Sequence, residues 1–204
     1  MVDWFRRVGD IPGVEFDGSP DVDRSQLPGH DAVPELHDFE LEGRKRESLW
    51  WPAPGGGGSA SPVHHRAFSD WREVPTSRLL RNVYEGLELP GEPSDYHFLV
   101  QGCANELWGR RRQEPEVLDK VEQFCLFDLR LIEARPDAVS DEFSDEPRFY
   151  RVLAFAILIN IYQREGFLHE ALDVAERAAR FGQENEAQDR LLERIAAVEA
   201  EYAD

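Results

Sequence analysis

The stretch that most constrains the fold covers residues 149–181, FYRVLAFAILINIYQREGFLHEALDVAERAARF. Its first half is almost wholly apolar, the pattern breaks at Arg164-Glu165-Gly166, and its second half is amphipathic. Apolar residues at helical spacing on both sides of a glycine predict two helices folded back on each other. Because the first helix is apolar nearly all round, it must be covered by other parts of the chain.

Other segments also repeat apolar residues at helical spacing. Helices are predicted at residues 75–86, 94–112 and 115–135. A last amphipathic helix, over residues 185–202, can cover the exposed face of the hairpin as a capping helix. Residues 137–147, DAVSDEFSDEP, carry acids and no base, and we expect them to form an exposed loop.

The first 54 residues form an arm of a different kind. Recurrent prolines exclude a long helix, and the alternation of Leu36, Phe39 and Leu41 suggests a strand that residues 42–44 could turn into a short β-hairpin. The aromatic residues of the arm argue against disorder. We therefore expect an irregular, extended arm that docks either on its own domain or on a partner.

A glycine-rich linker separates this arm from the helices. Residues 55–62 begin with GGGGS, a flexible run that fits a natural boundary as well as an engineered tether. The predicted division is an arm over residues 1–54, a linker over residues 55–62 and an all-α domain over residues 63–204.

Charge restricts the class of partner. The chain of 204 residues has 41 acidic and 23 basic residues, a formal net charge of −18. Nucleic-acid affinity depends on neutralising phosphates with Lys and Arg, so no nucleic-acid partner is expected. The acidity either serves solubility alone or attracts a basic protein.

Neither a membrane segment nor a secretory signal is predicted. The N-terminus lacks an apolar signal core, and the longest apolar run, residues 152–159, is far shorter than the roughly 20 residues that span a bilayer. Cys103 and Cys125 lie in apolar helical patterns and are expected to be buried thiols of a reducing compartment. These features together predict a cytoplasmic protein.

The spacing inside the 149–181 hairpin resembles a tetratricopeptide repeat. The matching positions are Phe155, Leu158, Ile159, Tyr162, Gly166, Ala171, Ala175 and Ala178. The repeat reads W-x2-L-G-x2-Y in its first helix and A-x3-F in its second, over about 34 residues. The chain departs from it at Ile159, Ala175 and Gln183, where the repeat has a small residue, an aromatic residue and a proline.

The resemblance covers residues 152–185 and implies antiparallel helical hairpins, two in number, with a C-terminal capping helix. The layout is also similar to uncharacterised bacterial tetratricopeptide-like domains, which imply no activity. Such folds bind peptides in the groove made by their first helices. By this resemblance, Asn160, Gln163 and Arg164 would face that groove and bind a partner.

Two further readings stay open for these polar residues. Asn160 interrupts an apolar run, so its amide either pairs inside the protein or meets a ligand in the groove. The run Arg110, Arg111 and Arg112 either is a solvated helix end or receives a carboxylate or phosphate.

No catalytic or cofactor motif is present in the sequence. It lacks a nucleophile elbow, a phosphate-binding glycine loop and a zinc-protease motif. The adjacent His64 and His65 have no third ligand nearby, so neither a metal nor another cofactor is expected.

The sequence therefore predicts a non-catalytic adaptor or scaffold that binds a protein or peptide. The alternative is an acidic inhibitor, similar to an immunity protein or antitoxin, that neutralises a basic enzyme. The sequence leaves the oligomeric state open.

Replacing Ala171 tests the predicted hairpin. An Ala171→Phe substitution should lower the free energy of unfolding by about 1–3 kcal/mol, because a bulky ring cannot fit between two closely packed helices. Thermal denaturation followed by circular dichroism measures the effect. An unchanged melting temperature would contradict the hairpin.

Overall fold

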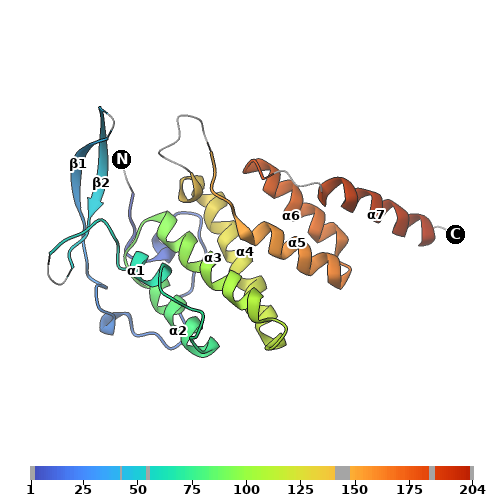
Figure 1. The fold of residues 1–204 in the computed structure, drawn as a ribbon, viewed down its shortest axis with the longest axis horizontal. Helices are drawn as coiled ribbons and strands as arrows, with labels where there is room; N and C mark the ends of the chain where they lie inside the picture. The colour runs from blue at the N-terminus through green and yellow to red at the C-terminus, as the bar shows by residue number, and fades with distance from the viewer. Residues whose placement is uncertain (1–2, 42, 54–55, 141–147, 184–186, 203–204) are drawn as a thin grey trace.

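The computed structural model describes residues 3–41, 43–53, 56–140, 148–183 and 187–202. This part of the chain is mostly helical, as predicted, with one small sheet on its N-terminal side (Figure 1). Its α-helices are α1 (His64–Ala67), α2 (Thr76–Leu87), α3 (Pro93–Arg110), α4 (Leu118–Ala134), α5 (Leu153–Glu165), α6 (Leu168–Arg180) and α7 (Ala187–Tyr202). The strands are β1 (Glu35–Leu41) and β2 (Arg44–Trp50), and the 3₁₀ turns are η1 (Val8–Asp10), η2 (Arg24–Gln26), η3 (Pro115–Val117) and η4 (Pro136–Val139).

Helix α3 lies at the centre of the molecule and packs against α1, α2, α4 and α5. A proline in its first turn and a capping box between Glu92 and Asp95 begin the helix. Its first half is buried on nearly all sides, and Tyr96, Leu99 and Val100 are each at most 1% exposed. A helix buried all round needs an apolar neighbour on every side, which the flanking helices and the arm supply.

A buried polar pair joins α3 to α4. Nδ1 of His97 lies 2.7 Å from Oδ1 of Asp128, and both side chains are fully buried. Among the described residues, neither Nε2 of His97 nor Oδ2 of Asp128 has a hydrogen-bond partner. Burial raises the pKa of Asp128 above its usual value, although His97 opposes the shift. Each group is tolerated in the core because the other is present.

The α5–α6 hairpin turns at Gly166, whose φ of 86° places it in the left-handed region. Glycine adopts this conformation without the strain that a Cβ causes, and so it ends α5. The buried side chains of Ala171, Ala175 and Ala178 leave room for α6 to approach α5. At the start of α5, Gln183 accepts a hydrogen bond from the Val152 amide at 3.0 Å. Helix α6 is thereby tied to the start of α5.

Helix α7 packs on α6 through the buried residues Leu191 and Ile195. Its distal half continues away from the other helices (Figure 1). Leu192 and Val198 are accordingly 48% and 39% exposed. The terminal helix therefore covers α6 over part of its length.

The prediction of an exposed loop over residues 137–147 is wrong for residues 137–139. Residues Pro136–Val139 form η4, which packs on α3 and α4. Ala138 and Val139 are 1% and 0% exposed, because their apolar side chains fill the space beside α3. The rest of the predicted loop, residues 141–147, lies outside the described residues.

The arm docks on its own helices. Val8, Ile11, Val14 and Leu27 are buried in the same hydrophobic core as the side chains of α2, α3 and α4. Polar contacts hold the arm as well, since Glu88 accepts a hydrogen bond from the Ser19 amide at 2.7 Å. Burial of apolar area thus fixes a segment that has little regular structure of its own.

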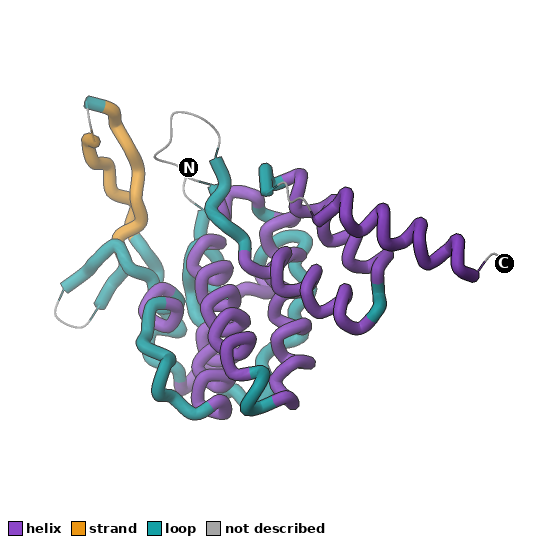
Figure 2. Tube along the Cα trace, turned by 45° about the vertical axis from the view of Figure 1, so that its right-hand side comes forward, coloured by secondary structure: helices purple, strands orange, loops and turns teal. Residues whose placement is uncertain are grey.

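Strands β1 and β2 form the antiparallel hairpin suggested by the sequence, with Glu35 opposite Trp50 and Leu41 opposite Arg44. Gly43 has a φ of 76° at the turn, and residue 42 lies outside the described residues. Figure 2 shows the hairpin standing away from the helices. A small cluster at its base includes Trp4 and Trp51, whose rings meet edge to face at 5.7 Å.

Both cysteines are free and buried, as predicted. Burial raises the pKa of Cys103 and Cys125, and neutral thiols are compatible with their apolar surroundings. They act here as small core residues.

Replacing a core residue of the arm should destabilise the helices. Ile11 is 2% exposed, so Ile11→Ala should lower the free energy of unfolding by about 2–5 kcal/mol through lost burial and a residual cavity. Val33 is 56% exposed, and Val33→Ala should change it by less than about 0.5 kcal/mol. Urea denaturation of the full chain measures both values. Equal effects of the two substitutions would show that the arm does not belong to the core.

Removing one member of the buried pair should cost more than removing an exposed acid. Asp128→Ala leaves His97 without its partner in the core and should lower the free energy of unfolding by about 3–5 kcal/mol. The control Asp119→Ala removes an exposed acid from the first turn of α4 and should cost at most about 1 kcal/mol. Urea denaturation at neutral pH gives both numbers. A loss in Asp128→Ala no larger than in the control would rule out the pair as a core contact.

Candidate functional site

Helices α3 and α5 lie next to each other and run in the same direction (Figure 1). Near one end, Oε1 of Gln101 accepts a hydrogen bond from the Leu153 amide at 2.6 Å. Near the other end, the Tyr162 hydroxyl donates to Oε1 of Glu122 at 2.8 Å. Glu122 lies early in α4, and α4 follows the end of α3 after a short turn. Tyr162 lies near the end of α5, so its contact with Glu122 places the C-terminal ends of α3 and α5 at the same end of the bundle.

Each of the two helices has a strip of exposed or half-buried residues in which amides and arginines alternate with apolar side chains. The spacing of three or four residues places members of a strip on one side of a helix. We call these residues the α3–α5 face: Gln101, Asn105, Trp108, Arg112, Leu153, Ala156, Asn160 and Arg164. Each is exposed or half-buried, and Arg112 continues the spacing in the turn just after α3.

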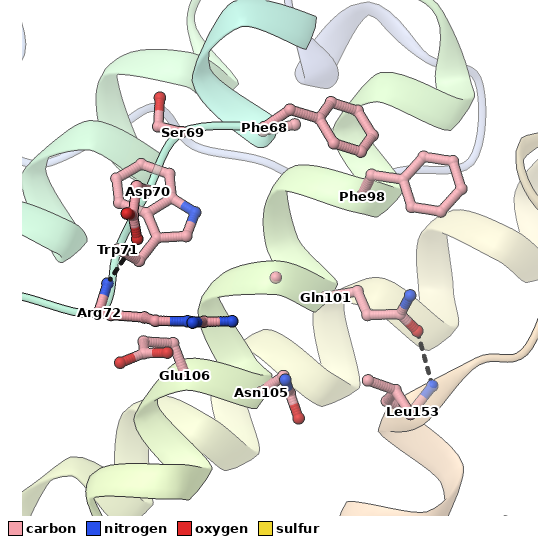
Figure 3. A pocket seen from close by; sticks show the side chains of 12 residues that line it. Phe68, Ser69, Asp70, Trp71, Arg72, Phe98, Gln101, Asn105, Glu106 and Leu153 are labelled. Atoms are coloured by element: carbon pink, nitrogen blue, oxygen red, sulfur yellow. Dashed lines mark hydrogen bonds between the residues drawn. The ribbon is translucent and has the colours of Figure 1, made fainter.

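An open pocket of about 640 Å³ lies at the first end of this face (Figure 3). The rings of Phe68, Trp71 and Phe98 supply apolar walls, and the amides of Gln101 and Asn105 line another side. Phe68 is 61% exposed, and its ring lies 5.7 Å from that of Phe98. Such a mixture of exposed aromatic rings and amides is typical of a binding site for a partly apolar ligand.

Arg110 fixes one wall of the pocket. It donates hydrogen bonds to the carbonyl oxygens of Val74 at 2.7 Å and Trp71 at 2.8 Å, and it pairs with Glu106 at 3.0 Å. These bonds tie the segment between α1 and α2 to the end of α3. Arg110 is a predicted partner-binding residue. In the structure its guanidinium N–H groups bond within the protein and hold one wall of the pocket.

The other predicted residues lie at the second end of the α3–α5 face. Arg111 covers the Trp108 ring, with its guanidinium carbon 3.8 Å from the ring centroid. Desolvation lowers the pKa of Arg111, and repulsion by Arg112 and Arg164 lowers it further. Arg164, from one of the two candidate sites that the sequence suggested, thus lowers the pKa of Arg111, from the other.

Asn160 is exposed, so the interpretation that its amide is buried and paired inside the protein is wrong. The apolar run continues around it because the other faces of α5 pack on α4 and α6. Gln163 is half-buried and lies one position before Arg164. Sequence reasoning missed Gln101 and Asn105, although amides four residues apart on one predicted helix were a usable signal.

Ser61, His64 and Asp95 form a hydrogen-bonded group at the start of α1. Oγ of Ser61 donates to Asp95 at 2.6 Å, and Nδ1 of His64 lies 3.2 Å from the other oxygen of Asp95. This hydrogen bond raises the pKa of His64. The carboxylate stands between the hydroxyl and the imidazole, so His64 cannot take the proton of Ser61 as a general base requires. The Ser61 hydroxyl also accepts from the His64 amide, which begins α1.

The described residues contain no cluster of three or more His, Cys, Asp or Glu side chains able to hold a metal ion. His64 and His65 meet edge to face with ring centroids 6.4 Å apart. Likewise, within the described ranges, every helix is too short or too polar to cross a membrane.

Comparison with protein-family models, curated proteins and solved structures finds no match to this chain.

Proposed function

We propose that this protein is a non-catalytic interaction module that binds an extended segment of a partner protein along the α3–α5 face. The observation that carries this proposal is the pair of amides at Gln101 and Asn105 in a pocket that exposed aromatic rings also line, with the exposed amide of Asn160 on the neighbouring helix α5. A side-chain amide can donate to a carbonyl and accept from an N–H at the same time. Such groups can therefore hold the backbone of an extended segment with little regard to its sequence.

The dimensions of the face favour a short segment. Arg112 lies eleven positions after Gln101, which corresponds to about 16 Å at the rise of an α-helix. A fully extended chain covers that distance in about five residues. An apolar side chain of the segment would enter the pocket beside Phe68 and Phe98, and the following residues would pass Asn105 and Asn160.

The proposed architecture is tetratricopeptide-like. In this reading, α3–α4 and α5–α6 are successive antiparallel hairpins, and α7 covers the last one. The first helices of the two hairpins, α3 and α5, would line the binding groove. The parallel course of these helices and the alanines of α6 support this arrangement. Gln183 stands where the repeat has proline, and its bonds to the Val152 amide and the Tyr150 carbonyl give that position a different role.

The net charge of −18 favours a second candidate function, an acidic inhibitor of a basic enzyme. Electrostatic association weakens as salt is added, whereas contacts in an apolar pocket are less sensitive to salt. Steep loss of binding above physiological ionic strength would favour the inhibitor, and little change would favour the segment-binding module.

Selection of peptides from a random displayed library tests segment binding by the full chain. Peptides selected on the wild-type protein should bind the Asn105→Ala/Asn160→Ala variant roughly tenfold more weakly, since two hydrogen-bonding amides are lost. Fluorescence anisotropy of a labelled selected peptide measures the dissociation constants.

Gln123→Ala provides the matched control, because Gln123 is an exposed amide of α4 outside the α3–α5 face. Its affinity for the same peptide should equal that of the wild type, and circular dichroism should show that all variants keep their helices. Failure to select any peptide, or equal binding by the double variant, would reject the proposed function.

A further inference from the structure

The β1–β2 hairpin carries exposed aromatic rings at a distance from the helices (Figure 2). Phe39 and Trp50 are 40% and 42% exposed, and the ring of His37 stacks on that of Trp50 at 5.5 Å. The strand register places these three side chains on one face of the hairpin. Val33 and Leu36, which are also exposed, lie beside them in the chain. Apolar side chains gathered on a projecting element are typical of an interaction surface.

The hairpin has little support of its own. Strand β1 packs chiefly against β2, and β2 reaches the arm through a small cluster at the base of the hairpin, formed by Trp4, Ala32, Leu49 and Trp51. A two-stranded hairpin is marginally stable in water and becomes stable when a third strand or a helix joins it. A third strand on an open edge would supply what the two strands lack.

The outer edge of β1 is open. In the described part of the chain, β1 pairs with β2 alone. A two-residue turn joins a hydrogen-bonded pair, here Leu41 and Arg44, and such pairs recur at every second position of an antiparallel ladder. The residues of β1 between them direct their backbone N–H and C=O groups away from β2. These residues are Leu36, Asp38 and Glu40.

The outer edge of β2 is closed at one end. By the same alternation, Trp51, which follows β2, directs its backbone groups away from β1. Its N–H donates to the Gly58 carbonyl oxygen at 2.6 Å, and the Gly58 N–H donates to the Trp51 carbonyl oxygen at 2.9 Å. The edge of β1 is therefore the better place for an added strand.

Charge restricts what can join this edge. Strand β1 carries the exposed acids Glu35, Asp38 and Glu40 and no Lys or Arg, on a protein whose net charge is −18. Pairing β1 with β1 of a second copy would place acids beside acids. Pairing β1 with β2 of a second copy would leave the same edges open again and extend into a filament. A basic strand of another protein has neither disadvantage.

We propose that the outer edge of β1 binds an extended basic strand of a partner protein as the third strand of the sheet. Backbone hydrogen bonds to every second residue of β1 would hold the strand. Its apolar side chains would lie on the face of Phe39 and Trp50, and its basic side chains would lie on the opposite face beside Asp38 and Glu40. The hairpin lies apart from the α3–α5 face, so this site does not rest on segment binding there (Figure 1).

A capped eight-residue peptide in which lysine and valine alternate tests this site on the full chain. Fluorescence anisotropy of the labelled peptide should show saturable binding that weakens as salt is added. The same peptide with glutamate in place of lysine should bind at least about tenfold more weakly, because its charges face the acids of β1. Hydrogen exchange followed by NMR should show that the amides of Leu36, Asp38 and Glu40 become protected when the lysine peptide binds.

Two substitutions of Asp38 separate backbone pairing from charge. Asp38→Pro removes an outward N–H, which an edge strand tolerates, and should weaken peptide binding at least about fivefold while β2 keeps its NMR signals. Asp38→Lys lies opposite Glu47 and should weaken binding at least about threefold through repulsion. The control Glu170→Lys makes the same change in net charge at an exposed acid of α6 and should leave the affinity within about twofold of the wild type.

Absence of binding by the lysine peptide, equal binding of the glutamate peptide, or binding without protection of the three β1 amides would overturn the proposal. Equal losses of affinity in Asp38→Lys and Glu170→Lys would also overturn it, because net charge alone would then explain binding. Protection of the same amides that grows with protein concentration and needs no peptide would assign the edge to a second copy of the chain instead.

Discussion

The burial of α3 is the constraint on which the remaining structure depends. Its first half places apolar side chains on every side, together with His97, which cannot be left alone in a core. Asp128 of α4 meets that requirement, and α2 approaches so closely that a Cβ at Gly86 would lie 2.5 Å from Leu99. The side that α2 and α4 leave open is closed by the arm, through Val8 and Ile11. The helices and the arm therefore share one core.

The same burial decides where a ligand can bind. The first half of α3 is used by the core, whereas its second half keeps an open side next to α5. Gln101 connects the core half of α3 with its open half, since its side chain accepts a hydrogen bond from the Leu153 amide and also lines the pocket. Arg110 then orders the segment between α1 and α2, which brings Trp71 to the pocket. Arg110, one of the predicted partner-binding residues, thereby holds one wall of the pocket in place.

Charge acts differently at the two ends of the α3–α5 face. At the pocket, Glu106 is paired with Arg110, and the charged side chains of Asp70 and Arg72 line the cavity together with aromatic rings and amides. At the far end, the Arg111 guanidinium lies over the Trp108 ring, and the charges of Arg112 and Arg164 lower its pKa.

The sequence by itself determined the longer helices α2 to α7, their order and the turn at Gly166, because helical periodicity, caps and glycine conformations are local properties. It also determined that Cys103 and Cys125 are buried, since both lie on apolar stripes. Only the tertiary structure decided that Asn160 is exposed, that Ala138 and Val139 are buried, and that Arg110 supports the pocket. These outcomes depend on which helix covers which face, and residues far apart in the chain settle that through packing. The arm shows the same limit, because packing alone decided that Phe5 and Phe16 join the core around α3 whereas Trp4 joins Trp51 in a separate cluster.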